Sequence, residues 1–428
     1  MAIACGENTT IVCGEDGNIF TFGDNVIPNN KAGTIQTMKA SFRNKEVVMA
    51  SIGRGHKACI TSDGILWTWG TSLTGESGHG DCKTRERPQI IPRSVFDGSS
   101  AVMVSCGINH MMVLTAERVV FTCGSNSYGQ LGLGSCYDHD ELTKIKGFFG
   151  VCMVACGSTF SMAVTRNGRL YSWGNNNDAQ LGHNDYLQRI SPTIISSHVF
   201  AGNAVESVSA GKFHAAAVTT NGDLYLWGAN NTGQLGMDAG PTNKNPTILS
   251  VFNDFPVSTV TCCERHTMVV LRNGALWTFG ISKPTLGHNK ATGVPTRVDA
   301  NHFNNAKIVC VAGGEWHSVA VTDTGDLYTW GVSNALGYAD DKKTYIPTRV
   351  VSSLLGNSRV GCFHDLLPEH ALAFVMCQHK RLGEGSMYME LEQGIIMLII
   401  ELCMFQPQDI LHEMPGLARM LGFGSMLS

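Results

Sequence analysis

Five histidines recur at one position of a repeated motif, and of all side chains in this 428-residue chain they most suggest chemistry. Each lies three residues after a glycine or, once, after a cysteine; the pairs are Gly53 and His56, Gly107 and His110, Gly211 and His214, Cys263 and His266, and Gly314 and His317. Several imidazoles converging near an axis could bind a metal or transfer protons. Because each occupies the same place in a repeated frame, we instead predict that they donate hydrogen bonds to the backbone of a neighbouring repeat. We therefore assign these glycines and histidines a structural role.

No other motif predicts catalysis or metal binding. Cysteines and histidines stand close together at Cys362 and His364, at Cys377 and His379, and at Cys262, Cys263 and His266. None of these groups has the two-residue-spaced cysteines typical of a structural zinc site. The sequence also has no phosphate-binding loop, no nucleophile elbow and no paired carboxylates in a recognisable context. We therefore expect no catalytic residue, no metal site and no cofactor.

The histidine motif belongs to a longer frame that occurs seven times, with 17 residues between its first and last positions in every copy. The first positions are Gly6, Gly53, Gly107, Gly157, Gly211, Cys263 and Gly314, and the last are Gly23, Gly70, Gly124, Gly174, Gly228, Gly280 and Gly331. Eleven residues after each first position stands a glycine, usually preceded by Asn or Asp, except in the copy that has Arg118. Asn-Gly and Asp-Gly between short apolar runs predict a β-hairpin, because the favoured turn needs positive φ at both central residues.

A loop and a proline-containing segment complete the repeat. The loop reads SYGQLG at Ser127 to Gly132 and TGQLG at Thr232 to Gly236. Prolines follow at Pro192, Pro246, Pro295 and Pro347, and proline in a strand belongs at a sheet edge, so this segment is predicted to be the outermost strand. Four strands in a unit of about fifty residues cannot bury a sheet face alone, and stacking around a ring is the usual solution. We predict an all-β fold, a seven-bladed β-propeller.

The segment AGKFHAAAVTTNGDLYLWGANNTGQLG, from Ala210 to Gly236, closely resembles the repeat of the regulator of chromosome condensation family. The resemblance runs from about Ala4 to Val350 and implies a seven-bladed propeller. The family includes exchange factors for the small GTPase Ran, propeller modules of ubiquitin ligases and a plant ultraviolet receptor. Membership of such a family implies the fold but does not decide the activity.

Departures from these relatives bear on function. The Ran exchange factor resembles this chain but carries a basic terminal tail and an inserted β-hairpin wedge, and this sequence has no such tail and little room for a wedge. The Gly-Trp-Arg-His-Thr sequence of the light receptor is absent, and only Trp316 adjoins a repeat histidine. Substrate recognition in a ubiquitin ligase would need a ligase domain, and none is visible in this chain.

We predict that the propeller domain spans residues 1–382 and is followed by a short α-helical C-terminal tail, residues 383–428. The repeats lie near 4–50, 51–104, 105–154, 155–208, 209–260, 261–311 and 312–358, with a closing half-repeat at 359–377. The half-repeat would close the ring against the first repeat, and an overlapping or eight-bladed closure is the alternative. In the tail, Pro407 ends one helix and Pro415 interrupts the next. Its methionine-rich surface either packs on the propeller or serves as an adaptable binding face.

Composition limits the classes of partner. The net charge of −4 and the pI near 6.4 give no overall attraction to nucleic acid or anionic lipid. The longest apolar stretch, residues 394–405, is interrupted by Glu401 and is shorter than the ~20 residues a membrane-spanning helix needs. The amino terminus does not resemble a signal peptide, so the 15 cysteines indicate reduced, mostly buried residues of an intracellular protein. We expect a monomer in the cytoplasm, the nucleus or both.

The two residues between each repeat glycine and its histidine vary in charge and aromatic character from copy to copy. In a ring they would recur on the same part of successive blades, which suits selective protein binding, although any single one also fits an ordinary solvated strand end. The candidate partner-binding residues are Arg54, Asn109, Lys212, Phe213, Arg265, Glu315 and Trp316. We predict a non-catalytic protein–protein interaction platform or regulatory scaffold. The alternative is a guanine-nucleotide exchange factor for a Ran-like small GTPase.

Overall fold

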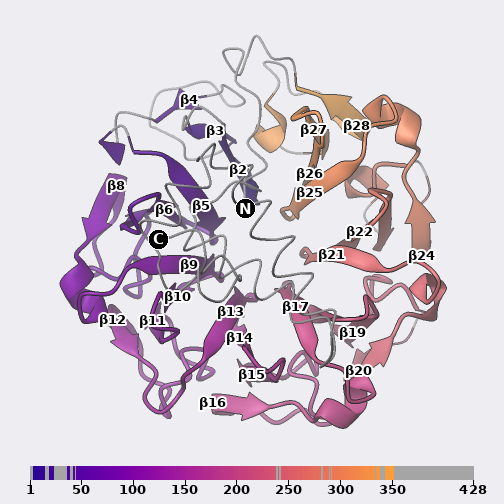
Figure 1. Ribbon diagram of the computed structural model, residues 1–428. Helices are drawn as coiled ribbons and strands as arrows, with labels where there is room; N and C mark the ends of the chain where they lie inside the picture. The colour runs from indigo at the N-terminus through magenta and orange to yellow at the C-terminus, as the bar shows by residue number, and fades with distance from the viewer. Residues whose placement is uncertain are drawn as a thin grey trace, which may run out of the picture. The chain divides into compact units, whose positions relative to one another are not determined.

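Seven four-stranded sheets stand around a common axis in the computed structural model of the chain (Figure 1), which confirms the predicted all-β seven-bladed propeller. The structure describes residues 3–14, 19–23, 36–38, 42–43, 45–237, 240, 242–280, 283–288, 290, 292–332, 334–337 and 343–350. We number the sheets as blades 1 to 7 in chain order. Blade 1 consists of β1 (Ile3–Cys5), β2 (Thr9–Cys13), β3 (Ile19–Gly23) and β4 (Gln36–Thr37), and blade 2 of β5 (Val47–Ile52), β6 (His56–Thr61), β7 (Leu66–Gly70) and β8 (Arg85–Ile91). Blade 3 consists of β9 (Ala101–Cys106), β10 (His110–Thr115), β11 (Val120–Gly124) and β12 (His139–Lys144), blade 4 of β13 (Val151–Cys156), β14 (Phe160–Thr165), β15 (Leu170–Gly174) and β16 (Arg189–Ile194), and blade 5 of β17 (Val205–Ala210), β18 (His214–Thr219), β19 (Leu224–Ala229) and β20 (Thr242–Ile248). Blade 6 consists of β21 (Val257–Cys262), β22 (His266–Leu271), β23 (Leu276–Gly280) and β24 (Thr292–Arg297), and blade 7 of β25 (Ile308–Gly313), β26 (His317–Thr322), β27 (Leu327–Gly331) and β28 (Thr344–Arg349).

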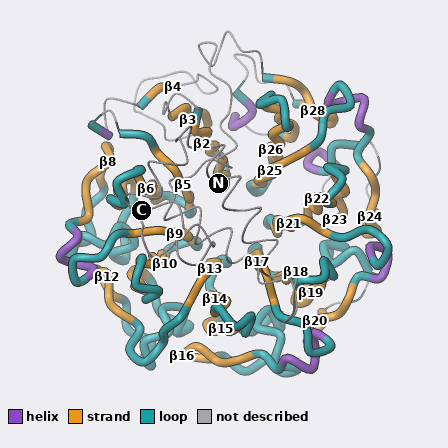
Figure 2. The backbone as a smooth tube through the Cα atoms, viewed as in Figure 1, coloured by secondary structure: helices purple, strands orange, loops and turns teal. Residues whose placement is uncertain are grey.

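Within each blade the chain runs outward from the ring axis as an antiparallel meander (Figure 2). In blade 2, β5 pairs with β6, β6 with β7 and β7 with β8. The hairpin between the second and third strands turns at Gly64, whose φ is +75°. Arg118 takes the same position in blade 3 with φ +62°, a conformation that costs a residue with a Cβ roughly 1 kcal/mol. The four prolines lie where the sequence predicts, on the outermost strands β16, β20, β24 and β28.

Both faces of a blade are covered by neighbouring blades. The second strand is buried along its whole length in each of blades 2 to 7, so it shows none of the polar–apolar alternation of a half-exposed sheet. The hydrophobic core is accordingly divided among the blade interfaces; between blades 4 and 5, for example, Met162 and Val164 pack with Ala217 and Trp227. Burial on both faces gives each blade two partners and makes the ring its unit of stability.

Short 3-10 helices occur in the connections. They are η2 (Arg93–Phe96), η3 (Ser197–Phe200), η4 (Ser250–Phe252), η5 (Lys283–Thr285), η6 (Ala300–Phe303) and η7 (Asn334–Leu336). Four of them, η2, η3, η4 and η6, bury a phenylalanine beside the next blade, as where Phe303 meets Tyr328 edge to face with 5.1 Å between ring centroids. The described residues include no helix that is long and apolar enough to cross a membrane.

Blade 7 meets blade 1 directly. Strand β1 packs against both β25 and β5, and Ile3 and Val12 share a core cluster with Val319 and Val321. The predicted closing half-repeat 359–377 and the predicted helical tail 383–428 lie outside the described residues. Each predicted repeat boundary after the first falls four residues inside the innermost strand of a blade; β5 begins at Val47, for example, and the boundary lies at 51.

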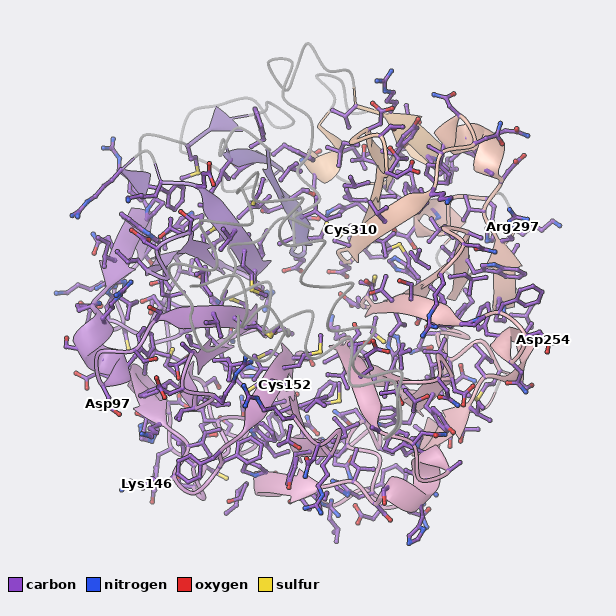
Figure 3. All side chains as sticks on the ribbon, in the orientation of Figure 1. Asp97, Lys146, Cys152, Asp254, Arg297 and Cys310 are labelled. Atoms are coloured by element: carbon purple, nitrogen blue, oxygen red, sulfur yellow. The ribbon has the colours of Figure 1, made fainter. Side chains whose placement is uncertain are left out.

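Position along a blade separates inner from outer side chains. Cys152 on β13 and Cys310 on β25 lie near the ring axis, whereas Asp97, Lys146, Asp254 and Arg297 lie at the periphery (Figure 3). The turn between the innermost and second strands is therefore close to the axis, and this is where the repeated glycine and histidine stand.

Candidate protein-binding site

Seven tight turns join the innermost strand of each blade to its second strand. In every one the backbone N–H of the repeat's first residue donates to the carbonyl three residues later, as from Gly53 to His56 at 2.9 Å. The two intervening residues form the tip. We call these tips the turn ring: Glu7-Asn8, Arg54-Gly55, Ile108-Asn109, Ser158-Thr159, Lys212-Phe213, Glu264-Arg265 and Glu315-Trp316. The candidate residues from all five blades that contribute one thus lie at equivalent places.

Adjacent turns touch through their backbones, which explains the repeated glycine. A Cβ on Gly314 would lie 2.2 Å from the carbonyl oxygen of Gly6 in the next blade, and one on Gly107 would lie 2.5 Å from that of Gly157. The same Cβ atoms would also collide with the repeat histidine of their own blade. Backbone hydrogen bonds continue between turns, as from the Ile108 N–H to the Ser158 carbonyl at 3.1 Å. The glycine therefore permits the close approach of neighbouring blades.

The repeat histidines connect neighbouring blades through hydroxyl groups. In four of the five, Nε2 lies 2.8–3.0 Å from a hydroxyl that follows the equivalent position in the next blade; the pairs are His110 and Ser161, His214 and Thr267, His266 and Ser318, and His317 and Thr10. The hydroxyl in turn donates to a loop carbonyl of the histidine's own blade, as from Ser161 to Gln130 at 2.7 Å. Since that uses the only hydroxyl hydrogen, the imidazole Nε2–H must be the donor. The acceptor is thus a side chain and not the backbone that the sequence suggested.

Burial keeps these imidazoles neutral. It lowers the pKa of His110, His214 and His266 to about 3, and that of His317 to about 4. In a neutral imidazole whose Nε2–H is committed to a hydroxyl, the lone pair is on Nδ1, and in these four histidines Nδ1 is buried, in three of them beside the repeat glycine. Among the described residues, no group of three or more His, Cys, Asp or Glu side chains could hold a metal ion.

Three blade interfaces depart from this pattern. Blade 1 has Thr9 in place of the histidine, and blade 2 has Lys57 in place of the hydroxyl. Blade 4 has Phe160 in place of the histidine, and the next blade has Ala215 in place of the hydroxyl, so the two substitutions match. Blade 2 keeps His56, but Met111 replaces the hydroxyl, and neither ring nitrogen of His56 has a hydrogen-bond partner among the described residues. Burial lowers the pKa of His56 to about 4, partly opposed by the charge of Glu76.

Charged tips of blades 5, 6, 7, 1 and 2 form a continuous arc. Lys212 pairs with Glu264 of the next blade, and Arg265 lies 3.7 Å from the same carboxylate. Between blades 1 and 2, the Arg54 Nε lies 3.2 Å from an oxygen of Glu7. We call Lys212, Glu264, Arg265, Glu315, Glu7 and Arg54 the charged arc.

Glu315 occupies the middle of the charged arc. Its carboxyl interacts with the carboxylates of Glu264 and Glu7, one from each neighbouring blade. Burial and the charge of Glu264 raise the pKa of Glu315 to about 6, although Lys212 acts in the opposite direction. Three carboxylates thus lie together with the cations Lys212, Arg265 and Arg54, and the ion pairs among the described residues use Glu264 and Glu7 but not Glu315.

Aromatic rings stand among these charges. The Lys212 ammonium lies 5.4 Å from the ring centroid of Phe213, and the Arg265 guanidinium lies 5.8 Å from that of Trp316. Trp316 is 37% exposed, whereas the tryptophans at the ends of the third strands, such as Trp173 and Trp227, are completely buried. A half-exposed indole held by a cation offers a rigid apolar contact surface.

The remaining tips carry no charge. Blades 3 and 4 contribute Ile108, Asn109, Ser158 and Thr159, which we call the neutral arc, and the Ser158 hydroxyl is occupied by a 2.6 Å hydrogen bond to the Lys212 carbonyl. Of the seven predicted partner-binding residues, the structure brings six into the charged arc and its aromatic companions and places Asn109 alone in the neutral arc.

Sequence reasoning missed Glu7, because its repeat has Thr9 in place of the histidine. The signal was available in Gly6, which marks the same turn, and in the opposite charge of Arg54 at the matching position of the next repeat. It also missed a second set of imidazoles at Gly-His steps in the outer loops. His183, for example, lies 2.9 Å from the Ser172 hydroxyl of its own blade and fixes the loop that precedes the outermost strand.

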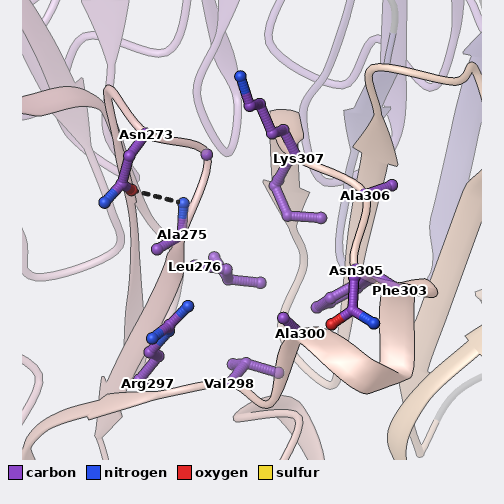
Figure 4. Close-up of a pocket in the computed structure, with 12 residues that line it drawn as sticks. Asn273, Ala275, Leu276, Arg297, Val298, Ala300, Phe303, Asn305, Ala306 and Lys307 are labelled. Atoms are coloured by element: carbon purple, nitrogen blue, oxygen red, sulfur yellow. Dashed lines mark hydrogen bonds between the residues drawn. The ribbon is translucent and has the colours of Figure 1, made fainter.

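A cavity away from the turn ring offers little to a ligand. It has a volume of about 170 Å³ and lies beside the β22–β23 hairpin turn at Asn273 and the segment from Phe303 to Lys307 (Figure 4). Small-molecule sites usually enclose about 300–1,000 Å³. The turn ring, which is open and polar with aromatic anchors, fits a macromolecular partner better.

Comparison with known proteins gives repeat matches along most of the propeller. The regulator of chromosome condensation (RCC1) repeat matches residues 63–114, 119–164, 167–218 and 221–270, and a second version of the same repeat matches 102–130, 151–180, 205–234 and 308–337. The ultraviolet-B receptor UVR8 of Arabidopsis thaliana is 34% identical over 67% of this chain and 65% of its own length.

Other relatives differ in size or in closeness. The human E3 ubiquitin-protein ligase HERC2 is 29% identical over 63% of this chain, which corresponds to only 6% of the ligase. The chain thus spans less than two thirds of either of these curated relatives. Prp20p of Saccharomyces cerevisiae, solved together with a study of its binding to Gsp1p and histones, superposes with a TM-score of 0.64 at 19% identity, covering 83% of this chain and 84% of Prp20p. That likeness is one of fold.

Proposed function

Because this chain belongs to the regulator of chromosome condensation (RCC1) repeat family, we propose that its propeller is an interaction platform that binds a protein partner at the turn ring without covalent chemistry. The charged arc carries this proposal. Its charges are only partly paired, the side chain of Arg54 is 65% exposed, and a half-exposed Trp316 lies among them. Side chains with no structural task in the blades are thereby held in fixed positions on one surface.

The chemistry of the arc indicates how the partner is held. Trp316, stacked with Arg265, supplies an anchor of the kind that dominates the binding energy of protein interfaces. Arg54, Lys212 and the carboxylates around Glu315 supply a pattern of both signs, which selects partners and orients their approach. The partner therefore carries complementary charges of both signs around an apolar pocket.

The finer alternative is that the partner is a small GTPase and that binding releases its nucleotide. Support comes from the yeast relative, which was studied for binding to Gsp1p. Nucleotide exchange needs no covalent catalysis, so the same turn ring could serve it. The two proposals differ in a single measurable quantity, the rate of nucleotide release.

The first test measures release of fluorescent GDP from a panel of small GTPases, Ran included, with and without the purified chain. Catalytic acceleration that disappears in Trp316→Ala and persists in Asn109→Ala would establish exchange. If no GTPase responds, a photo-reactive amino acid placed at position 316 or 109 is used to cross-link partners in cells. Partners that cross-link at position 316 and not at position 109 would support the platform. If no partner cross-links at position 316, or if the same amount is recovered from both positions, the turn ring is rejected as the binding site.

Assembly and compartment follow from the sequence as further proposals. We propose a monomer that works in the cytoplasm, the nucleus or both, and a propeller domain that extends to residue 382. Light scattering during gel filtration should give one species near 46.1 kDa, whereas about twice that mass would reject the monomer.

A further inference from the structure

Exposed apolar side chains gather on the outer loops of blades 2, 3 and 4. Tyr137 is 80% exposed, Leu73 78% and Leu187 68%. We define the rim patch as six large side chains that are each at least 37% exposed: Leu73, Tyr128, Tyr137, Tyr186, Leu187 and Ile190. Large apolar residues that cluster on a surface mark interaction sites more often than residues exposed singly.

The rim patch lies at the same end of the strands as the turn ring. Each of these outer loops starts beside a turn: the Ser125 N–H donates to the Asn109 carbonyl at 2.8 Å, and the Thr71 N–H donates to the Gly55 carbonyl at 3.0 Å. The rim patch and the neutral arc therefore occupy the same sector of one face, on blades 3 and 4, with an extension onto blade 2.

Contacts between neighbouring loops hold the three loops side by side. The blade 2 loop rests on blade 3 so closely that a Cβ on Gly75 would lie 2.1 Å from the Asp140 Cα. The blade 3 loop rests on blade 4, where the Gly134 N–H donates to the Ile190 carbonyl at 2.9 Å and the Gln188 amide donates to Cys136 Sγ at 3.4 Å. Leu73, Tyr137 and Leu187 are thus carried by three loops that fix one another.

Charge distinguishes blade 3 from its neighbours within this patch. In blades 2 and 4 the outermost strand begins with an arginine that pairs with a loop aspartate, Arg85 with Asp81 and Arg189 with Asp185, both at 2.8 Å. In blade 3 the same place, opposite the last glycine of the frame, is taken by His139. Asp140 and Glu141 follow it, both exposed, and no Lys or Arg of the described residues forms an ion pair with either.

We infer that the rim patch is a second protein-binding surface and that its partner is a polypeptide segment presenting lysine or arginine beside large apolar side chains. The exposed tyrosines and leucines supply the apolar contact. The uncompensated carboxylates of Asp140 and Glu141 supply the charge complementarity, and they disfavour nucleic acid and acidic peptides. This inference stands apart from the proposed role of the turn ring, since it uses none of the turn-ring residues.

The test selects random dodecapeptides displayed on phage against the purified full-length chain, and then measures the Kd of the enriched peptides by fluorescence anisotropy. Enriched peptides should combine Lys or Arg with Leu, Phe or Trp. The double variant L73S/Y137S should weaken their binding about tenfold or more, since exposed anchors of this size carry much of an interface's energy. The double variant D140N/E141Q should weaken binding about threefold to tenfold and reduce its dependence on salt.

Two variants separate this site from others. Phe255→Ser removes a 51% exposed aromatic side chain from the connection between η4 and β21. This connection lies at the end of the blades opposite to the rim patch, so the variant should leave the Kd unchanged. Trp316→Ala should also leave it unchanged, which distinguishes the rim patch from the turn ring. The inference is overturned if no peptide is enriched, if the enriched peptides are acidic, or if they bind L73S/Y137S as tightly as the unaltered chain.

Discussion

The charged and neutral arcs of the turn ring are built on the same turns and carry different tips. Gly107 in the neutral arc and Gly314 in the charged arc both face the carbonyl of the next blade, and His110 and His317 both donate to a neighbouring hydroxyl. Above this shared frame, one arc carries ion pairs and an exposed indole, and the other carries Ile108 and Asn109. A repeat fold thus separates what holds the ring together from what a partner could recognise.

This separation predicts that damage to the frame is equally severe in both arcs. We expect Gly107→Ala and Gly314→Ala each to lower the free energy of unfolding by about 3 kcal/mol, since the added Cβ meets backbone and imidazole atoms within 2.5 Å. Urea unfolding followed by tryptophan fluorescence measures the loss. Gly240→Ala is the control, because a Cβ there meets nothing within 4 Å. A large loss in one arc only would contradict the idea of a common frame.

Damage to the tips should instead distinguish the arcs. Trp316→Ala is expected to weaken binding of the partner by about 2 kcal/mol, roughly thirtyfold, because a half-buried tryptophan beside a cation is a typical hot spot. Asn109→Ala should change binding by less than about 0.5 kcal/mol, and neither variant should alter the unfolding midpoint appreciably. Isothermal titration calorimetry with the purified partner, once cross-linking has identified it, measures both changes in binding free energy. Equal losses at the two positions would remove the distinction between the arcs.

The matched departure at blades 4 and 5 gives a way to test the histidine links through pH. The double variant H214F/T267A copies the pairing of Phe160 with Ala215 into the next interface. The pKa of His214 is lowered to about 3, so the unfolded chain binds a proton below its pKa of about 6.5 while the folded chain does not. Stability is therefore greatest above pH 6.5 and falls toward pH 3, by about 1.4 kcal/mol per pH unit for this histidine.

Between pH 6.5 and 4.5 we expect the free energy of unfolding to fall less for H214F/T267A than for the unaltered chain. The two slopes should differ by about 1.4 kcal/mol per pH unit, the effect of one proton. Urea unfolding at several pH values measures the two slopes. The single variant Thr267→Ala keeps the imidazole but removes its acceptor, so it should be destabilised at every pH by about 1–3 kcal/mol. Identical slopes for the double variant and the unaltered chain would show that His214 does not titrate on unfolding.

Within the charged arc, Glu315→Gln should be mildly stabilising. The pKa of Glu315 is raised to about 6, so between its unfolded pKa near 4.5 and pH 6 the folded chain binds more protons, and the ionised form is the disfavoured one. Above pH 6 we expect the variant to gain about 1 kcal/mol or less, after allowance for solvent screening, and below pH 4.5 to gain nothing. Unfolding at pH 4.5 and 7.5 checks this. A gain that does not depend on pH would mean that the carboxylate cluster is not its cause.

Much of this architecture could be predicted because each repeated residue has one local reason to be there. The turn glycines need positive φ, and the prolines need a strand edge, so Gly64 and Pro192 predict their elements without reference to the rest of the ring. The equivalent places of Lys212 and Trp316 also follow from the repeat alone. The place of a residue in its blade can therefore be predicted from its position in the repeat alone.

Contacts between blades were harder to predict, because they join residues about fifty positions apart in the sequence. The acceptor of His110 is a serine of the next blade, and the charge cluster at Glu315 combines blades 6, 7 and 1. Nothing near His110 or Glu315 in the sequence indicates these partners. Comparison of the same position in successive repeats could have found them, since His110 precedes a repeat with Ser161 and Phe160 precedes one with Ala215.

The smallest expected effect concerns the ion pair that bridges blades 1 and 2. Arg54 and Glu7 lie 3.2 Å apart, but their side chains are 65% and 40% exposed, so water and salt screen the attraction. A double-mutant cycle with Arg54→Ala and Glu7→Ala should give a coupling energy of about 0.5 kcal/mol or less in unfolding at low salt, and almost none at 1 M salt. The same two variants should weaken partner binding more than they weaken folding, because a tip charge is available to the partner and contributes little to the frame. A coupling above about 1.5 kcal/mol would instead place Arg54 and Glu7 in the frame, and the charged arc would then begin at Glu315.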